Sequence, residues 1–184
     1  MNPENAISEL LQGNKRYVDG CTTSQNLPAD RAMLSQGQSP IAAVIRCLDS
    51  RVAPEIVFDQ PLGKLLVCSV AGNIPTIEIV ESLEYAVQYF RLSLIVVMGH
   101  SNCLAVAAAM ENEFPEGIFA QIAIPPTPDM DEAIAHNAEQ GINTILGRSM
   151  LIEDVVKSGN LQIVAGVQDI ASGEFELAAQ TKLN

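Results

Sequence analysis

The stretch SLIVVMGHSNCLAVAAAMENEF, residues 93–114, contains the two patterns that decide the fold. Its first part, residues 93–98, is apolar and rich in β-branched side chains, which is typical of a strand buried on both faces of a parallel sheet. The part that follows, residues 103–114, has the pattern of a helix. A strand that leads directly into a helix is the building unit of an α/β fold.

The same alternation extends along the rest of the chain. Three further runs share the pattern of a buried strand, at 41–45, 65–70 and 161–167. Helical patterns occupy 76–92, 129–147 and 149–159, whereas the proline-rich segment 122–129 is expected to be a loop. Alternating strands and helices imply right-handed crossovers, so we predict an α/β fold. Its mainly parallel β-sheet would have about four core strands and be flanked by helices.

An N-terminal helical arm is predicted to precede this core. Apolar residues recur at helical spacing from Ile7 to Tyr17, and Gly20 follows as a stop signal. The next segment is polar and rich in turn residues, with one short helix expected to end near Gly37. We therefore predict a single domain over 1–184, with the arm at 1–36 and the α/β core at 37–184.

Composition limits the possible partners and compartments. The 184 residues are 48% hydrophobic and only 17% charged, and this low charged fraction suggests buried contacts between subunits. The formal net charge of −12 argues against nucleic acid and anionic membranes as partners. No stretch reaches the roughly 18 apolar residues of a membrane span, and no secretory signal is visible, so we expect a soluble cytoplasmic protein.

Reactive side chains follow the predicted strands. Ligands of α/β sheets bind beyond the carboxyl ends of the strands, so these side chains are expected to meet in one crevice. They are Cys47, Asp49 and Arg51 after the first strand, and His100 and Cys103 after the third. In a chain of this size without a visible export signal, cysteines are more often metal ligands, catalytic groups or core residues than disulfide partners.

Two thiolates and one imidazole form a known set of zinc ligands. Catalytic zinc sites keep three protein ligands and an open fourth position, where the metal lowers the pKa of water. Asp49 would then either accept a hydrogen bond from bound hydroxide or become a fourth ligand in a closed state. Arg51 could hold Asp49 as an ion pair and set which role it plays.

Each residue also has a structural interpretation when it is taken alone. Cys47 could be a small core residue, His100 a hydrogen-bonded structural histidine, and Asp49 with Arg51 an ordinary ion pair. The spacing alone leaves both interpretations open. A dinucleotide-binding domain fits poorly, because no GxGxxG pattern follows the first strand.

At these residues the sequence resembles the β-class carbonic anhydrases. The resemblance covers nearly the whole chain and rests on GQSP (37–40), CLDSRVAPEIVFDQPLG (47–63), VAGN (70–73), GHSNC (99–103) and LQIVAGVQDIASGEFEL (161–177). It implies a Zn²⁺ cofactor held by Cys47, His100 and Cys103. It also implies that Asp49 and Arg51 form the pair that orients or displaces the zinc-bound water.

The resemblance extends to substrate and assembly. It implies reversible hydration of CO2 to bicarbonate and a proton by zinc-bound hydroxide. Gln38 falls where the family has a glutamine that lines the substrate site, often across a dimer interface, and Gly72 and Asn73 lie in a loop beside that site. The implied assembly is a homodimer with exchanged N-terminal helices, or a higher even-numbered oligomer.

Three positions depart from the family pattern. Ser69 stands where an arginine is usual, Leu104 where a glycine is usual, and Arg46 where the residue is commonly small or apolar. Arg46 is expected to point to the face opposite Cys47. These departures leave two alternatives open: a carbonyl sulfide or carbon disulfide hydrolase on the same zinc scaffold, and a catalytically impaired subunit with a binding or structural role.

Overall fold

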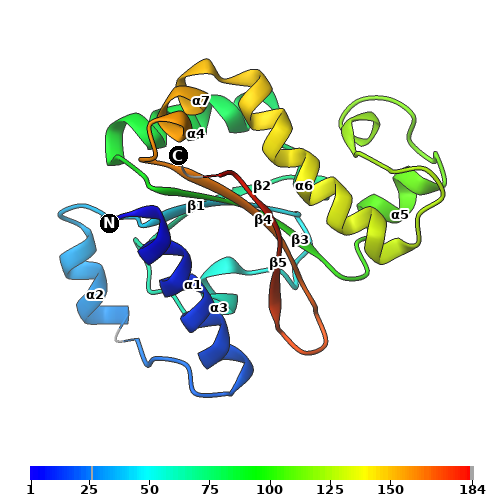
Figure 1. The fold of residues 1–184 in the computed structure, drawn as a ribbon. Helices are drawn as coiled ribbons and strands as arrows, with labels where there is room; N and C mark the ends of the chain where they lie inside the picture. Colours follow the sequence, from blue (N-terminus) through cyan, green and yellow to red (C-terminus); the bar gives the residue numbers. More distant parts are fainter. Residues whose placement is uncertain (26, 183–184) are drawn as a thin grey trace.

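Five strands form one sheet in the order β2-β1-β3-β4-β5. The structure is a computed structural model that describes residues 1–25 and 27–182. The strands are β1 (Ala42–Arg46), β2 (Leu65–Ser69), β3 (Leu94–His100), β4 (Gln162–Gln168) and β5 (Phe175–Gln180). The first four strands are parallel to one another, and β5 runs antiparallel to β4 (Figure 1). This confirms the predicted α/β class and the mainly parallel sheet.

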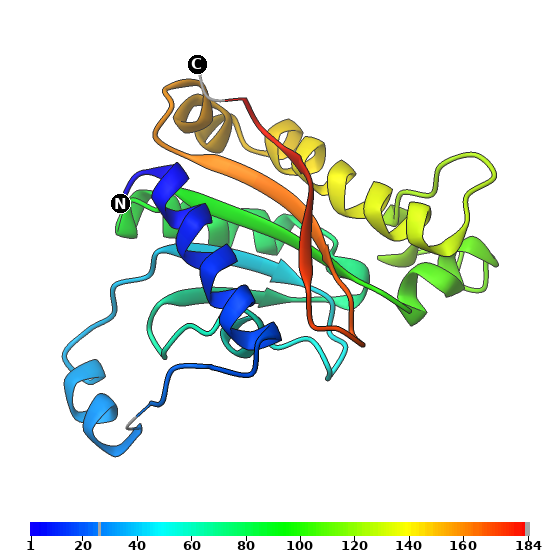
Figure 2. The same ribbon diagram turned by 60° about the horizontal axis from the view of Figure 1, so that its bottom comes forward.

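Helices cover both faces of the sheet (Figure 2). One face carries α1 (Pro3–Val18) and α3 (Pro54–Val57), with α2 (Leu27–Leu34) farther out. The other face carries α4 (Ile77–Phe90), α6 (Met130–Arg148) and α7 (Met150–Lys157). The short helix α5 (Leu104–Met110) directly follows β3. Two 3₁₀ turns, η1 (Ala71–Asn73) and η2 (Phe119–Gln121), complete the described elements.

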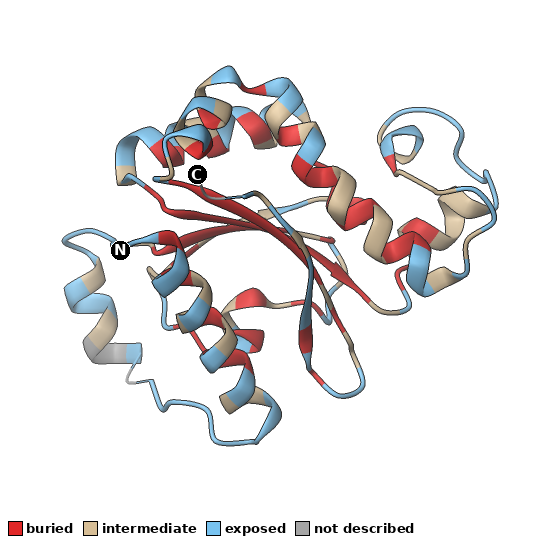
Figure 3. Ribbon diagram, viewed as in Figure 1, coloured by how far each residue is buried: buried red, intermediate tan, exposed pale blue. Residues whose placement is uncertain are grey.

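Burial on both faces explains why the central strands are continuous apolar runs. Alternate side chains of a strand point to opposite faces. Ala43 and Ile45 therefore pack against α4, α6 and α7, whereas Ala42 and Val44 pack against α1 and α3. The central strands are buried along their length in Figure 3.

The N-terminal helix is anchored to the sheet of its own chain. Ala6 and Leu10 of α1 are buried in the core, and the side chain of Asn14 joins three segments. Asn14 donates to the carbonyl oxygens of Val57 (3.1 Å) and Gly173 (2.8 Å), and its own oxygen accepts from the N–H of Phe175 (2.9 Å). The arm is thus tied to both α3 and the start of β5.

Two elements differ from the sequence-based expectation. The fifth strand, β5, was not among the predicted strands, because this edge strand exposes most of its side chains and so lacks a buried apolar run. The helix predicted over 103–114 ends at Met110, and Asn112 then adopts a left-handed backbone with φ 54°. No helix in the described part of the chain is long and apolar enough to cross a membrane.

Candidate metal centre

Parallel pairing brings the three candidate ligands to one edge of the sheet. Cys47 directly follows β1, His100 is the last residue of β3, and Cys103 is the residue that precedes α5. Strands β1 and β3 are direct neighbours in the sheet, so their carboxyl ends lie side by side. The structure therefore brings together the side chains that the sequence places at the ends of two separate strands.

The three side chains form a compact, buried cluster. The sulfurs of Cys47 and Cys103 are 3.9 Å apart, and one potential ligand atom from each of the three residues lies within 4.8 Å of the others. His100 is completely buried, and both cysteines are at most 4% exposed. These distances are short enough for one ion to contact all three residues.

The surroundings of His100 favour a metal. Its Nδ1 lies 3.0 Å from the carbonyl oxygen of Ser101, and a carbonyl can only accept, so Nδ1 carries the proton. The other nitrogen, Nε2, then presents a lone pair, and it is buried without a hydrogen-bond partner among the described residues. A buried polar atom without a partner is costly, whereas an imidazole held at Nδ1 by a carbonyl is the usual state of a metal ligand. The donor set of two sulfurs and one imidazole fits zinc.

The pKa values of the two cysteine thiols shift in opposite directions. The pKa of Cys47 is lowered to about 4, chiefly because the thiol of Cys103 donates to its sulfur. Burial opposes this effect, but the backbone N–H of Gly72, 3.4 Å from the Cys47 sulfur, adds to the lowering. The same contact raises the pKa of Cys103, because Cys103 must keep its proton to donate it. A cation bound to both sulfurs would replace this shared proton.

Arg51 holds both carboxylate oxygens of Asp49. The guanidinium donates from Nε to Oδ1 at 2.9 Å and from Nη2 to Oδ2 at 2.7 Å, and the Arg51 backbone N–H adds a bond to Oδ1 at 3.0 Å. These bonds lower the pKa of Asp49 well below its usual range. Oδ2 lies 4.0 Å from Nε2 of His100. An ionised carboxylate therefore stands at the edge of the candidate metal centre, fixed by a bidentate pair.

The predicted loop residues, Gly72 and Asn73, lie in a turn next to the candidate metal centre. Gly72, in η1, is buried and has φ 69°, and a β-carbon added to it would lie 2.9 Å from Cδ1 of Ile122. Asn73 is also buried, and its side-chain nitrogen has no hydrogen-bond partner among the described residues. The backbone N–H of Gly72 reaches the Cys47 sulfur, so this turn contacts a candidate ligand directly.

One supporting residue was missed by the sequence analysis. Asn137 of α6 is 5% exposed and donates to the carbonyl oxygen of Gly72 at 2.9 Å, while its oxygen accepts from the N–H of Ala123 at 3.0 Å. The only signal in the sequence is a polar residue within a row of buried helix positions that includes Ile134 and Ala138. A polar residue there is expected to need partners.

A cavity of about 590 Å³ opens onto the cluster. Cys47 and Asp49, which follow the end of β1, line it, and apolar side chains that include Leu48, Leu104 and Phe114 form much of its wall. Leu48 is 61% exposed and Leu104 is 78% exposed. The candidate metal centre therefore has a solvent-accessible, largely apolar entrance.

Gln38 is a predicted site residue that borders a different hollow of the surface. Its side chain is exposed and borders a separate hollow with Leu34 and Gly63. Within one chain the structure does not bring Gln38 to the candidate ligands. Its predicted contribution from a partner subunit stays a prediction.

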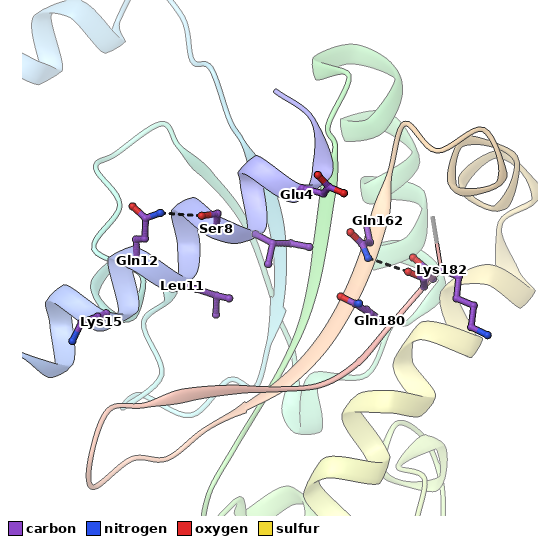
Figure 4. A pocket seen from close by; sticks show the side chains of 10 residues that line it. Glu4, Ser8, Leu11, Gln12, Lys15, Gln162, Gln180 and Lys182 are labelled. Atoms are coloured by element: carbon purple, nitrogen blue, oxygen red, sulfur yellow. Dashed lines mark hydrogen bonds between the residues drawn. The ribbon is translucent and has the colours of Figure 1, made fainter. Parts of the chain in front are cut away.

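A groove separate from this cavity lies between α1 and the strands β4 and β5 (Figure 4). Gln12 donates to Ser8 along the helix at 2.9 Å, and on the opposite wall Gln162 donates to the carbonyl oxygen of Thr181 at 3.0 Å. Neither the candidate ligands nor the Asp49–Arg51 pair lines this groove. It therefore has no part in the candidate metal centre.

Comparison with known proteins agrees with this geometry. The family model described as "Carbonic anhydrase" matches residues 42–124, which include all three candidate ligands. A carbonic anhydrase of Mycolicibacterium smegmatis is 36% identical, over 96% of this chain and 93% of that protein. Carbonic anhydrase 2 of Mycobacterium tuberculosis is 33% identical over the same shares of the two chains.

Solved structures share the fold. A tetrameric β-carbonic anhydrase of Sordaria macrospora superposes with a TM-score of 0.71 at 24% identity, over 84% of this chain and 89% of that one. The β-carbonic anhydrase CcaA also gives a TM-score of 0.71, at 22% identity over 98% of this chain and 95% of that one. The chain belongs to the β-class family of carbonic anhydrase enzymes.

Proposed function

We propose that this protein catalyses the zinc-dependent, reversible hydration of CO2 to bicarbonate and a proton. The observation that carries the proposal is the buried, unpartnered Nε2 of His100 beside the sulfurs of Cys47 and Cys103. These three residues would hold Zn²⁺, which supplies a Lewis acid that makes water nucleophilic near neutral pH.

Asp49 would act on the water molecule that attacks CO2. Its carboxylate stays ionised because Arg51 donates to both of its oxygens, so it can accept a hydrogen bond from that water and orient it. Arg51 keeps Asp49 beside the ligands rather than free to rotate towards them. The hydrogen bonds from Arg51 favour an active site in which Asp49 is not a metal ligand. For Asp49 to become a fourth ligand, these hydrogen bonds would have to break.

The cavity suits a small apolar gas. Leu48, Leu104 and Phe114 offer apolar contact near the entrance, and Gly72 and Asn73 form the turn behind the ligands. We propose that Gln38 reaches the cavity of a partner subunit, since it is exposed and lies outside the cavity of its own chain.

A homodimer or larger even-numbered oligomer is part of the proposal. Large apolar side chains stay exposed in one chain, including Leu48, Tyr85, Tyr89 and Leu104. The four cysteines are unpaired, which suits the reducing cytoplasm. Light scattering coupled to size-exclusion chromatography measures the assembly, and a purely monomeric protein would contradict this part.

Metal analysis together with stopped-flow CO2 hydration tests the central proposal. We expect about one zinc per chain and activity that rises with pH. Cys103→Ser should lose most of the zinc and the activity, whereas Cys21→Ser, which changes an exposed thiol outside the cluster, should keep both. A zinc-loaded protein with no CO2 hydration would rule out the proposed reaction.

Hydrolysis of carbonyl sulfide or carbon disulfide is a second candidate. The observation that favours it is Leu104, which adds an apolar side chain to the cavity wall where the family usually has glycine. Rates with these gases and with CO2 on one preparation separate the two candidates. Faster turnover of the sulfur compounds would make CO2 hydration the secondary activity.

A further inference from the structure

Arg46 lies directly beneath the turn that carries Cys47 and Asp49. Its Nη1 donates to the carbonyl oxygen of Cys47 at 2.8 Å and to the carbonyl oxygen of Asp49 at 3.0 Å. Arg46 ends β1 on the same face as Ala42 and Val44, as its place in the strand predicts. The side chain therefore approaches the candidate metal centre through the backbone of the turn, not through the cavity.

The positive charge of Arg46 lies in a partly buried environment. The residue is partly buried, its Nε is buried without a hydrogen-bond partner, and no carboxylate among the described residues forms an ion pair with it. Burying a charge in this way is costly unless other groups compensate it. The compensation on Arg46 comes from the two carbonyl oxygens of the ligand turn.

The neighbouring strand supplies no alternative cation at this point. Arg46 stands opposite Ser69 of β2 in the parallel register, and Ser69 is the position at which the family resemblance calls for an arginine. The backbone bonds from Leu48 N–H to the Val70 carbonyl and from Val52 N–H to the Asp49 carbonyl hold the turn at its edges. Arg46 is the side chain that connects the carbonyls of Cys47 and Asp49 to each other.

We propose that Arg46 is a positioning residue for the metal centre. By holding two carbonyls two residues apart, its guanidinium fixes the direction of the Cys47 thiolate and of the Asp49 carboxylate together. Bonds to a charged donor are stronger than bonds between neutral groups, so they restrict the turn more firmly than its backbone contacts alone. This inference rests on the proposed zinc site, because its effect is on the geometry and lifetime of metal binding.

The test compares Arg46→Met, which keeps much of the length and loses the donors, with Arg46→Lys, which keeps the charge and loses the forked geometry. Arg31→Met is the matched control, since Arg31 is exposed on α2. The readouts are the rate of zinc release to a chelator and the sulfur-to-metal charge-transfer absorption of the cobalt-substituted protein.

Arg46→Met should release zinc about tenfold faster or more and alter the cobalt absorption, because supporting residues of metal ligands change affinity by about 10–100-fold. Arg46→Lys should fall between Arg46→Met and the wild type, and Arg31→Met should match the wild type. If Arg46→Met releases zinc at the wild-type rate and shows the wild-type cobalt absorption, the inference is overturned. If Arg46→Met fails to fold, Arg46→Lys decides by the same criterion. A wild-type protein that binds no zinc would instead refute the proposed function.

Discussion

The side-chain amide of Asn137 donates a 2.9 Å hydrogen bond to the carbonyl oxygen of Gly72, and this bond links α6 to the turn behind the candidate metal centre. Gly72 extends this connection to the metal centre, because its own N–H contacts the sulfur of Cys47. One buried side chain thus connects a helix on the face of the sheet to a candidate ligand at its edge.

Replacement of Asn137 should therefore weaken both the fold and the site. Asn137→Ala leaves the buried carbonyl of Gly72 and the N–H of Ala123 without this partner, and each such loss costs about 1–3 kcal/mol. We expect the free energy of unfolding, measured with urea, to fall by that order, and zinc release to accelerate. Asn143→Ala is the control, since Asn143 is exposed on the same helix. An equal loss in both variants would contradict a specific role for Asn137.

The buried carboxylate of Asp59 predicts how the stability of the fold depends on pH. Burial alone would raise the pKa of Asp59, but Arg16 and the backbone and hydroxyl of Thr23 donate to it, and together they lower its pKa below the ordinary value of 3.8. A carboxylate whose folded pKa is depressed stabilises the fold above its unfolded pKa. This contribution is lost as pH falls from about 4 through the folded pKa.

Asp59→Asn isolates that contribution. At pH 7 the variant should unfold with a free energy about 1–2 kcal/mol lower than the wild type, because the bonds from Arg16 and Thr23 lose their charged acceptor. The difference should shrink as pH falls below about 4. Urea unfolding of both proteins at several pH values measures it. A difference that stays constant down to pH 2 would show that the charge of Asp59 is not its cause.

The sequence was sufficient to predict the centre of the sheet and the meeting of the candidate ligands. Strands such as β1 and β3 are buried on both faces, so their apolar runs are unbroken and easily recognised. Once the strands are parallel, the rule that sites form at their carboxyl ends brings Cys47 to His100 and Cys103 without further information.

The remaining features depend on contacts that no local pattern records. The strand β5 forms at the sheet edge by pairing with β4, although its exposed side chains give no apolar run. Asn137 has a clear role only when its partners Gly72 and Ala123 are known, because they lie 65 and 14 residues away in the sequence. The role of Gln38 would require a second chain, which one sequence does not describe.

The bidentate pair of Asp49 and Arg51 predicts a strict requirement for arginine. Arg51→Lys keeps the positive charge but cannot donate to both carboxylate oxygens in a fixed fork. We expect the variant to keep its zinc and to lose about tenfold or more of its CO2 hydration rate, since Asp49 is no longer oriented. Metal analysis and stopped-flow kinetics measure the two properties, with Arg31→Lys as the control. Full activity in Arg51→Lys would show that charge alone is sufficient.

Leu104 predicts how the cavity selects among small gases. It is the first residue of α5, is 78% exposed and lines the cavity, so its removal should widen the entrance with little loss of stability. Leu104→Gly removes apolar contact that a larger, sulfur-containing gas would use more than CO2. The ratio of carbonyl sulfide hydrolysis to CO2 hydration should therefore fall by about threefold or more. Ile77→Gly is the matched control, because Ile77 is the first residue of α4, is 62% exposed and lies outside the cavity. An unchanged ratio in Leu104→Gly would mean that this wall of the cavity does not discriminate between the gases.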